Sequence, residues 1–302
     1  MRDRLTIFLV VAAAVVAFVS LVVETASAAP VRVQAWYMYS TTASALRSEA
    51  YRRGCSFAQA HPGGNRVLLL DFGAARKVSA GAWGALSFGS TVFSNEQILG
   101  ALKAAADGHH NCYGSGDTIV TYGNSNYRMA ASGMTQADAH SAGYYQSYRA
   151  QQLDAYQRAV GYNRQNAAIA SDVEPSWDSA PMSRAIVDGA TAHGYALLYD
   201  YGSADGCPAS GSGGSCNNGW TVGDVGYVSY SGVAVPLPEI YYTVNADQWT
   251  VVRRWWNSTH SWTYRFWGTT ATTAVGLSPA GGWDALAARN PGLVLSELTC
   301  FC

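Results

Sequence analysis

The sequence predicts one α/β domain with the architecture of a (β/α)8 TIM barrel. Short β-branched or aromatic runs alternate with helix-like stretches along the chain, which is typical of a parallel sheet. Eight such runs within 302 residues also suit a barrel of this kind, which needs about 250 residues. A doubly wound open sheet is the alternative, but no Gly-x-Gly-x-x-Gly opens a helix after the first strand.

The predicted strands are short apolar runs. In chain order they are residues 31–38, 66–72, 118–122, 167–173, 195–200, 226–230, 240–243 and 262–267. The predicted helices lie between them, at residues 42–59, 94–106, 141–160, 182–192, 246–256 and 283–288. Residues 231–238 are too short and proline-rich for a helix, so either one helix is missing between strands six and seven or the strand count is off by one.

The first 28 residues have the pattern of a secretory signal peptide. Arg2 and Arg4 precede an uncharged run over residues 5–23, and Ala26-Ser27-Ala28 supplies a cleavage site. The alternative is an uncleaved anchor, because the run could just span a bilayer. We expect cleavage after Ala28, a secreted or cell-wall-associated protein, and residues 29–302 as the barrel domain, without stable membrane insertion.

Six cysteines agree with an oxidising destination. Cys207 and Cys216 flank a Gly/Ser-rich stretch and are expected to pair. The other four are expected to staple the end of the chain to the amino-terminal rim of the barrel, and they are Cys55, Cys112, Cys300 and Cys302. Zinc is disfavoured, because the chain has no Cys-x-x-Cys and its adjacent pair His109-His110 is poorly spaced for one ion. No metal or cofactor is expected.

The composition favours a protein that handles neutral polymers. Charged residues make up 13% of the chain, against about 25% in average soluble proteins. With a net charge of -1 there is no basic face for a phosphate backbone, so a nucleic-acid partner is disfavoured. An apolar content of 49% excludes disorder. The 19 Tyr and 10 Trp suggest sugars, and we expect a polysaccharide or glycan partner.

The strongest motif is Asp172-Val173-Glu174, at the end of the fourth predicted strand. Residues two apart on a strand face the same side, so both carboxylates should lie within about 7 Å of each other. Each would then raise the proton affinity of the other, which lets one site hold a protonated acid beside an ionised base. The alternative is that the two acids cap the helix that begins near Pro181.

Other acids follow strands with less distinctive surroundings. Asp71 closes the second predicted strand and is a third catalytic candidate, although an ordinary loop cap looks the same. Asp200, between two tyrosines, could orient a sugar hydroxyl or a catalytic acid. Glu239 precedes the seventh predicted strand, so it is expected on the amino-terminal rim in a structural role.

Aromatic and amide side chains at the strand ends are candidates for binding sugar. Rings stack on sugar faces and amides bond hydroxyls, whereas the alternative is ordinary packing within the barrel. The candidates for substrate binding, besides Asp200, are Trp36, Tyr122, Asn124, Tyr199, Tyr242 and Trp267.

Nucleophilic serine and cysteine chemistry finds no support. No Gly-x-Ser-x-Gly elbow stands among the strand ends, and six bridged cysteines would leave no thiol. No histidine lies at a predicted carboxyl end of a strand, which disfavours catalytic triads. Carboxylate chemistry is what remains.

Asp172-Val173-Glu174 at the end of a fourth strand, followed by Leu197-Leu198-Tyr199, resembles the lysozyme-like family 25 glycoside hydrolases. The resemblance covers about a third of the chain. It implies a secreted bacterial barrel in which Glu174 is the general acid and Asp172 its partner. The first strand departs from that family, since it carries aromatic residues where the family has an acid, and Asp71 could substitute.

These observations predict a secreted glycoside hydrolase that cleaves a cell-wall or environmental polysaccharide. Two other functions stay open. The barrel could bind glycans without cleaving them, as part of the cell envelope, or it could be a structural envelope protein anchored by its leader.

Overall fold

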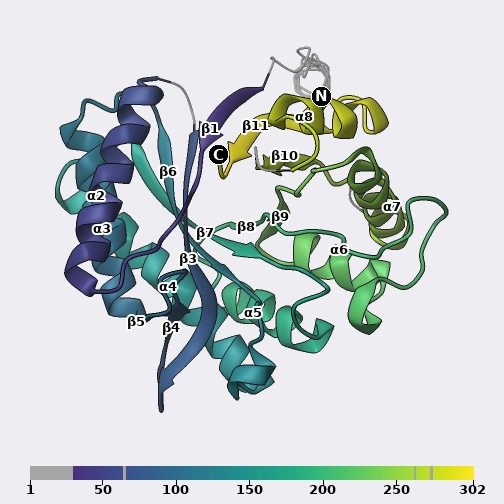
Figure 1. Ribbon diagram of the computed structural model, residues 1–302, viewed down its shortest axis with the longest axis horizontal. Coiled ribbons are helices and arrows are strands. Elements are labelled where there is room, and N and C mark those ends of the chain that lie inside the picture. The colour runs from purple at the N-terminus through teal and green to yellow at the C-terminus, as the bar shows by residue number, and fades with distance from the viewer. Residues whose placement is uncertain (1–29, 64–65, 262, 273–274) are drawn as a thin grey trace, which may run out of the picture.

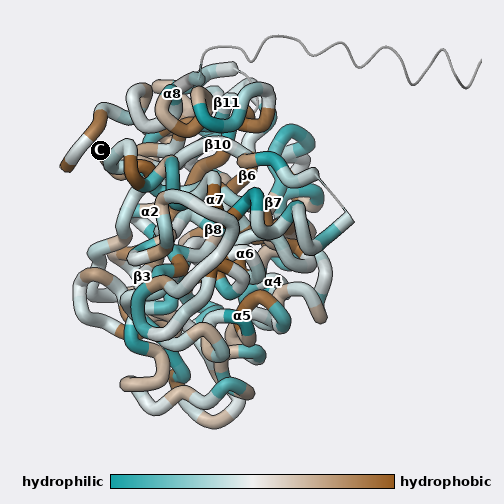
Figure 2. Tube along the Cα trace, turned by 90° about the vertical axis from the view of Figure 1, so that its right-hand side faces the viewer, coloured by the Kyte–Doolittle hydropathy of each residue, from teal (hydrophilic) through white to brown (hydrophobic). Residues whose placement is uncertain are grey.

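A computed structural model describes residues 30–63, 66–261, 263–272 and 275–302. In these ranges the chain has a mixed α/β fold, in which seven α-helices lie around a mostly parallel set of strands (Figure 1). The predicted signal peptide lies outside the described residues. Hydrophobic residues are spread along the whole trace (Figure 2). Within the described part of the chain, none of the helices has the length and apolar character needed to cross a membrane.

The elements follow one another in a repeating strand-helix order. They are β1 (Val31–Gln34), β2 (Trp36–Tyr37), α2 (Ala43–Ala60), β3 (Arg66–Ser79), β4 (Ala82–Leu86), β5 (Val92–Ser94), α3 (Asn95–Asn111), β6 (Thr118–Ser125), η1 (Ala130–Ser132), α4 (Gln136–Ala159), β7 (Gln165–Asp172), α5 (Ala180–His193), β8 (Leu198–Asp200), η2 (Asn217–Gly219), α6 (Val222–Tyr230), β9 (Ala234–Pro236), α7 (Thr243–Thr259), β10 (Phe266–Ala271), α8 (Pro279–Arg289) and β11 (Val294–Cys300).

The strands form two hydrogen-bonded sets, which approach each other at Ala35 and at Glu239. One set has the order β5-β4-β3-β6-β7-β8-β9, with β2 beside β3, and the other has the order β1-β11-β10. Only Ala35 separates β1 from β2, and its N–H donates to the Cys300 carbonyl oxygen at 2.7 Å. At the other end, a parallel bridge joins Glu239 to Thr270 of β10. Apart from the antiparallel β3-β4-β5 hairpins, the pairings are parallel.

Alternation along the strands separates two apolar layers. Ala168 and Ala170 of β7 pack with Leu69 of β3 in an inner cluster. Ile169 and Leu68, one position away, pack in the outer cluster that also contains buried residues of the helices. Because side chains two apart share a face, this register also turns the residues that follow on β3 and β7 toward the inner side.

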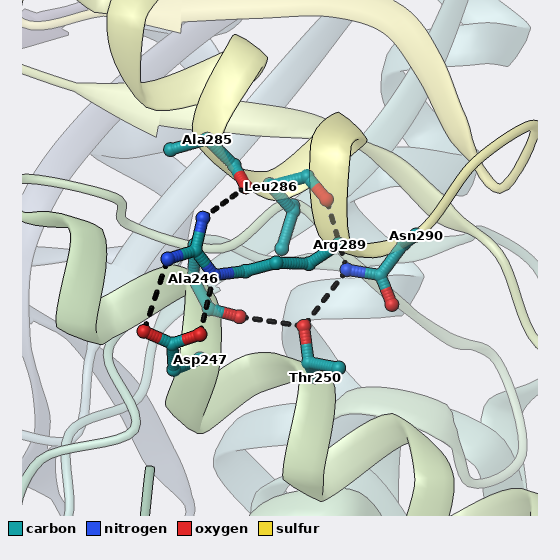
Figure 3. A network of polar contacts seen from close by, with 7 residues as sticks. All are labelled: Ala246, Asp247, Thr250, Ala285, Leu286, Arg289 and Asn290. Atoms are coloured by element: carbon teal, nitrogen blue, oxygen red, sulfur yellow. Dashed lines mark hydrogen bonds and ion pairs between the residues drawn. The ribbon is translucent and has the colours of Figure 1, made fainter. Parts of the chain in front are cut away.

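Polar contacts fasten α8 to α7 (Figure 3). The Arg289 guanidinium donates to both carboxylate oxygens of Asp247 and to the Ala285 carbonyl oxygen. The Asn290 amide donates to the Thr250 hydroxyl at 2.9 Å. These contacts hold α8 in place, and α8 leads directly into β11.

Three disulfides are present, as expected for an oxidising compartment. The predicted Cys207–Cys216 bridge is confirmed. The predicted staple between the end of the chain and the amino-terminal rim is wrong: Cys55 pairs with Cys112, and Cys300 pairs with Cys302. The last element is a strand rather than a helix, so Cys300 lies at the carboxyl edge of the sheet, opposite the ends of α2 and α3.

Three predicted strands lie elsewhere than expected. Residues 226–230 belong to α6, residues 240–243 form the loop that enters α7, and the sixth strand is β9, inside the stretch taken for a connection. No helix is therefore missing at this point, because α6 precedes β9 and α7 follows it. A buried helix and a buried strand have similar apolar runs, but the Thr221–Asp224 capping box marks a helix start.

The third misplaced strand, predicted at residues 262–267, is β10 at Phe266–Ala271, and Trp262 lies outside the described residues. The β4 and β5 strands and β11 were not predicted. The hairpins extend β3 well beyond residue 72 and form one wall of the site.

Candidate active site

Three carboxylates meet at the carboxyl edge of the sheet. Asp172 is the last residue of β7, Glu174 follows two positions later, and Glu239 lies three residues beyond β9. One carboxylate oxygen from each lies within 4.8 Å of the others. We call these three residues the acid cluster.

Backbone contacts hold Glu174 in this place. The Asn126 side chain accepts from the Glu174 N–H at 3.1 Å and donates to the Glu174 carbonyl oxygen at 3.0 Å. The same amide donates to the Ser183 hydroxyl at 2.9 Å, which ties it to α5. The loop after β7 is thereby anchored on both sides, so the Glu174 carboxyl projects from a fixed backbone.

The members of the acid cluster differ in their partners. Asp172 is 4% exposed, and its Oδ1 has no hydrogen-bond partner among the described residues. Glu239 is 5% exposed and accepts from the Tyr241 hydroxyl. Glu174 is half-buried. Asp172 therefore has an oxygen free for a substrate, and Glu174 is the most accessible of the three.

Burial and mutual repulsion favour protons on these groups. Burial, then Glu239 and Asp205, raise the pKa of Glu174 to about 9. Burial, with the neighbouring Asp205 and Asp200, raises the pKa of Glu239 to about 8, against the lowering effect of Tyr241. Burial raises the pKa of Asp172 well above its usual range, and the charges of Glu239 and Glu174 raise it further. The ionised neighbours that act on the cluster in the described structure are all acids.

Two further acids lie close by, on different faces. Asp71 is fully buried, accepts from the Gly73 N–H at 2.8 Å, and has a pKa raised by burial to about 6. Asp200 accepts from the Ser229 hydroxyl of α6 at 2.6 Å, and burial raises its pKa to about 7. Asp71 adds charge to the inner face, whereas Asp200 is held against a helix.

Two cavities flank the acid cluster. The larger, of about 410 Å³, has a mostly aromatic and apolar lining beside Asp172. Its lining residues are Tyr37, Gly73, Ala74, Leu86, Ser87, Phe88, Ser125, Tyr127, Asp172 and Trp177. The smaller, of about 190 Å³, is polar and is lined by Glu174, Ser203, Asp205, Glu239, Tyr241 and Asn245. We call them the aromatic cavity and the polar cavity.

The structure brings two of the three predicted catalytic acids, Asp172 and Glu174, together. The third, Asp71, lies outside the acid cluster and acts on Asp172 only through its charge. The structure also corrects the expectation for Glu239. That residue was placed on the amino-terminal rim, but it follows the carboxyl end of β9 and joins the acid cluster. The error came from the strand predicted at residues 240–243.

Most of the predicted sugar-binding residues lie away from the acid cluster. Trp36 packs against Phe57 and Arg53 of α2. Tyr122 is buried and donates to the Asn95 side chain. Asn124 is also buried and accepts from the Ser171 hydroxyl.

The remaining predicted aromatics line neither of the two cavities. Tyr199 is fully buried inside the inner cluster, in edge contact with Trp267. Trp267 is the second residue of β10, so it lies at the amino edge, where it lines a different cavity with Arg66 and Glu297. Tyr242 precedes α7 and is 51% exposed.

Several residues of the site were not predicted from the sequence. Tyr37 lines the aromatic cavity in place of Trp36, and Tyr241 bonds Glu239 in place of Tyr242. Alternation could have found Tyr37, because Ala35 belongs to the inner cluster and residues two apart share a face. Trp177 and Phe88 come from loops, for which no periodic signal exists.

Carboxylates in this arrangement can shuttle protons or surround a hard cation. Oxygens within 4.8 Å of one another could share one Ca²⁺, whose ligands lie at 2.3–2.6 Å. With protons instead, the same acids supply a general acid beside a carboxylate nucleophile or base. No family model matches the chain, and no curated protein matches it either.

Proposed function

We propose that this protein is a secreted glycoside hydrolase that uses the acid cluster for acid/base and nucleophilic catalysis. The observation that carries the proposal is the meeting of Asp172, Glu174 and Glu239 beside the aromatic cavity. Paired carboxylates beside a sugar-sized, ring-lined cavity are the usual catalytic groups for cleaving glycosidic bonds. The resemblance of Asp172-Val173-Glu174 to family 25 glycoside hydrolases supports the same conclusion.

Closure of the strands into a (β/α)8 barrel is part of the proposal. The β1/β2 segment pairs with β11 on one side and β3 on the other, and the Glu239–Thr270 bridge links the segment after β9 to β10. In such barrels the active site lies at the carboxyl ends of the strands. The acid cluster occupies that edge.

In this mechanism Glu174 is the general acid. It is half-buried, and with a pKa raised to about 9 by burial, Glu239 and Asp205 it carries a proton at neutral pH. Glu239 is protonated under the same conditions. Protons on Glu174 and Glu239 remove two of the charges that disfavour ionisation of Asp172, and the proposed mechanism assigns the nucleophilic carboxylate to Asp172.

The spacing of the acids favours retention of anomeric configuration. Carboxyl groups about 5–5.5 Å apart serve retaining enzymes, and the cluster oxygens lie within 4.8 Å of one another. Glu174 donates its proton to the glycosidic oxygen as the bond to the anomeric carbon breaks, while the Asp172 carboxylate bonds to that carbon. Glu174 then takes a proton from water, whose oxygen displaces Asp172 and releases the sugar.

The aromatic cavity provides the sugar-binding surface. Tyr37 and Trp177, which are far apart in the sequence, both line it, and the β3-β4 hairpin contributes Leu86. Rings of this kind stack on the apolar faces of sugars, and neutral walls suit an uncharged polysaccharide.

The test is release of reducing sugar from a panel of bacterial cell-wall and plant polysaccharides, by wild type and Glu174→Gln. We expect release from one polymer by wild type and a loss of about 10³-fold or more in the variant. The rival function is glycan binding without cleavage. It would be supported by binding to one polymer with no release from any, whereas an unchanged rate in Glu174→Gln would move the acid elsewhere.

A further inference from the structure

We propose that Asp205 is a positioning residue that holds the catalytic proton on Glu174, and that the Cys207–Cys216 loop holds Asp205 in place. This inference rests on the proposed function. It concerns the polar cavity, on the opposite side of the acid cluster from the sugar-binding rings.

Two carboxyl groups share the polar cavity, since both Glu174 and Asp205 line it. Asp205 lies close enough for its charge and for hydrogen bonding to raise the pKa of Glu174, after burial and Glu239. An ionised carboxylate can only accept hydrogen bonds, so a bond between two carboxyl groups requires a proton on one of them. The geometry therefore keeps a proton between Glu174 and Asp205.

Asp205 is itself anchored to the loop that carries Glu174. Its Oδ2 accepts from the Ser176 hydroxyl at 3.0 Å, two residues beyond Glu174. The Asn217 amide donates to the same hydroxyl at 3.0 Å. The Asn217 N–H also donates to the Asp205 carbonyl oxygen at 3.0 Å. Side chain and backbone of Asp205 are thus fixed from two directions.

The disulfide loop supplies that anchor. Asn217 directly follows Cys216, and Asp205 precedes Cys207 by two residues, so the bridge joins the two ends of the Asp205–Asn217 contact. Gly206, between Asp205 and Cys207, has φ +68°, and a Cβ at this position would lie 2.1 Å from Asn217 Oδ1. Gln248 of α7 donates to the Cys207 carbonyl oxygen at 2.9 Å. The loop is thereby closed and fastened to a helix.

Among the described residues, three carboxyl groups lie around Glu174: Asp172 at the end of β7, Glu239 after β9 and Asp205 after β8. The Tyr241 hydroxyl, which bonds Glu239, also lines the polar cavity. Asp205→Asn removes one of these negative charges. It also offers an amide donor, which favours the ionised form of Glu174. The pKa of Glu174 should therefore fall, and with it the alkaline limb of the hydrolysis profile.

The test is a ¹³C NMR titration of the glutamate carboxyl carbons, with Glu174→Gln used only to assign the Glu174 signal. We expect the Glu174 midpoint in Asp205→Asn to fall by about one pH unit or more. Ser176→Ala, which loosens Asp205 without changing charge, should move it in the same direction by less. Asp117→Asn, a matched change at the amino edge, should leave it unchanged.

Two disulfide variants test the loop. Cys207→Ser/Cys216→Ser should also lower the Glu174 midpoint, whereas Cys55→Ser/Cys112→Ser should not, since that bridge lies at the opposite edge. An unchanged midpoint in folded Asp205→Asn or Ser176→Ala would overturn the role of Asp205. An unchanged midpoint in the Cys207/Cys216 variant would overturn the role of the loop.

The alkaline limb of kcat/KM should follow the NMR midpoint across these variants. If wild type hydrolyses no glycan, the proposed function fails, yet the NMR titration still decides the Asp205–Glu174 contact. The two failures are therefore distinguishable.

Discussion

The two edges of the sheet treat buried acids differently. At the amino edge, burial raises the pKa of Glu297 to about 7, while the Val67 N–H, which donates to it, and the charge of Arg66 both lower it. At the carboxyl edge, the acid cluster has only other acids as charged neighbours in the described structure. Glu297 thus has a basic neighbour that favours its ionised form, whereas the acid cluster has acidic neighbours that disfavour ionisation. The contrast matches a division between a structural base and a functional face.

The largest expected effect that sharpens this comparison is on catalysis. Asp172→Asn should lower hydrolysis by about 10³-fold or more, because the amide cannot form the covalent intermediate. Initial rates on the polymer cleaved by wild type measure the loss. Asp117→Asn at the amino edge is the control and should keep nearly full activity. Comparable losses in both variants would remove the distinction between the edges.

The next effect concerns the amino edge. Cys55→Ser/Cys112→Ser opens a loop spanning 57 residues between α2 and α3, and it should lower the free energy of unfolding by about 2–4 kcal/mol. The activity of the folded variant at 25 °C should stay within about twofold of wild type. Denaturant unfolding and initial rates measure both. A loss of activity without a loss of stability would contradict the structural role of this edge.

A smaller effect concerns the pH dependence of stability. The folded-state pKa values of Glu174 and Glu239, about 9 and 8, lie above the ordinary value of 4.5. The folded state therefore binds more protons than the unfolded state in this window, so stability is highest near pH 4.5 and falls as pH rises toward 9.

Glu239→Gln tests the origin of this slope. It removes one buried ionisable group and should raise stability at pH 9 by about 1–3 kcal/mol relative to wild type. Urea unfolding at several pH values measures it, with Asp117→Asn, a change at an exposed acid of the amino edge, as the control. Stability of wild type that rose between pH 5 and 9 would show that the cluster is ionised and paired with a cation.

The smallest expected effect is that of chelation. In the proposed mechanism protons occupy the acid cluster, so EDTA should change the hydrolysis rate by less than about twofold. Rates with EDTA, and with added Ca²⁺ after dialysis, check this. A loss with EDTA that Ca²⁺ restores would mean that the cluster works around an ion.

Local periodicity predicted the parts of the site that lie on regular strands. Asp172 and Glu174 were found together because Ala168 and Ala170 precede them on the same face, and this register is present. Trp36 was predicted as a sugar-binding residue because it is an aromatic at a strand end. The face of the strand decides which ring points inward, and Tyr37 shares its face with the inner residue Ala35.

The rest of the site depended on tertiary structure. Glu239 was misplaced because residues 240–243 were predicted as a strand, whereas they lie on the connection from β9 to the start of α7. Trp177 and Phe88 lie on connections after β7 and β4, whose paths depend on long-range packing. The α/β alternation survived these errors, since it rests on many elements rather than on one boundary.

The central claim is that the carboxyl-edge acids perform hydrolysis and the amino-edge acid does not. Its most direct test is the hydrolysis rate of Glu174→Gln and Glu297→Gln side by side, on the polymer that wild type cleaves. Both changes replace a glutamate whose pKa is raised by burial, at opposite edges. We expect a loss of about 10³-fold or more for Glu174→Gln and less than about threefold for folded Glu297→Gln. Equal rates in the two variants would contradict the claim.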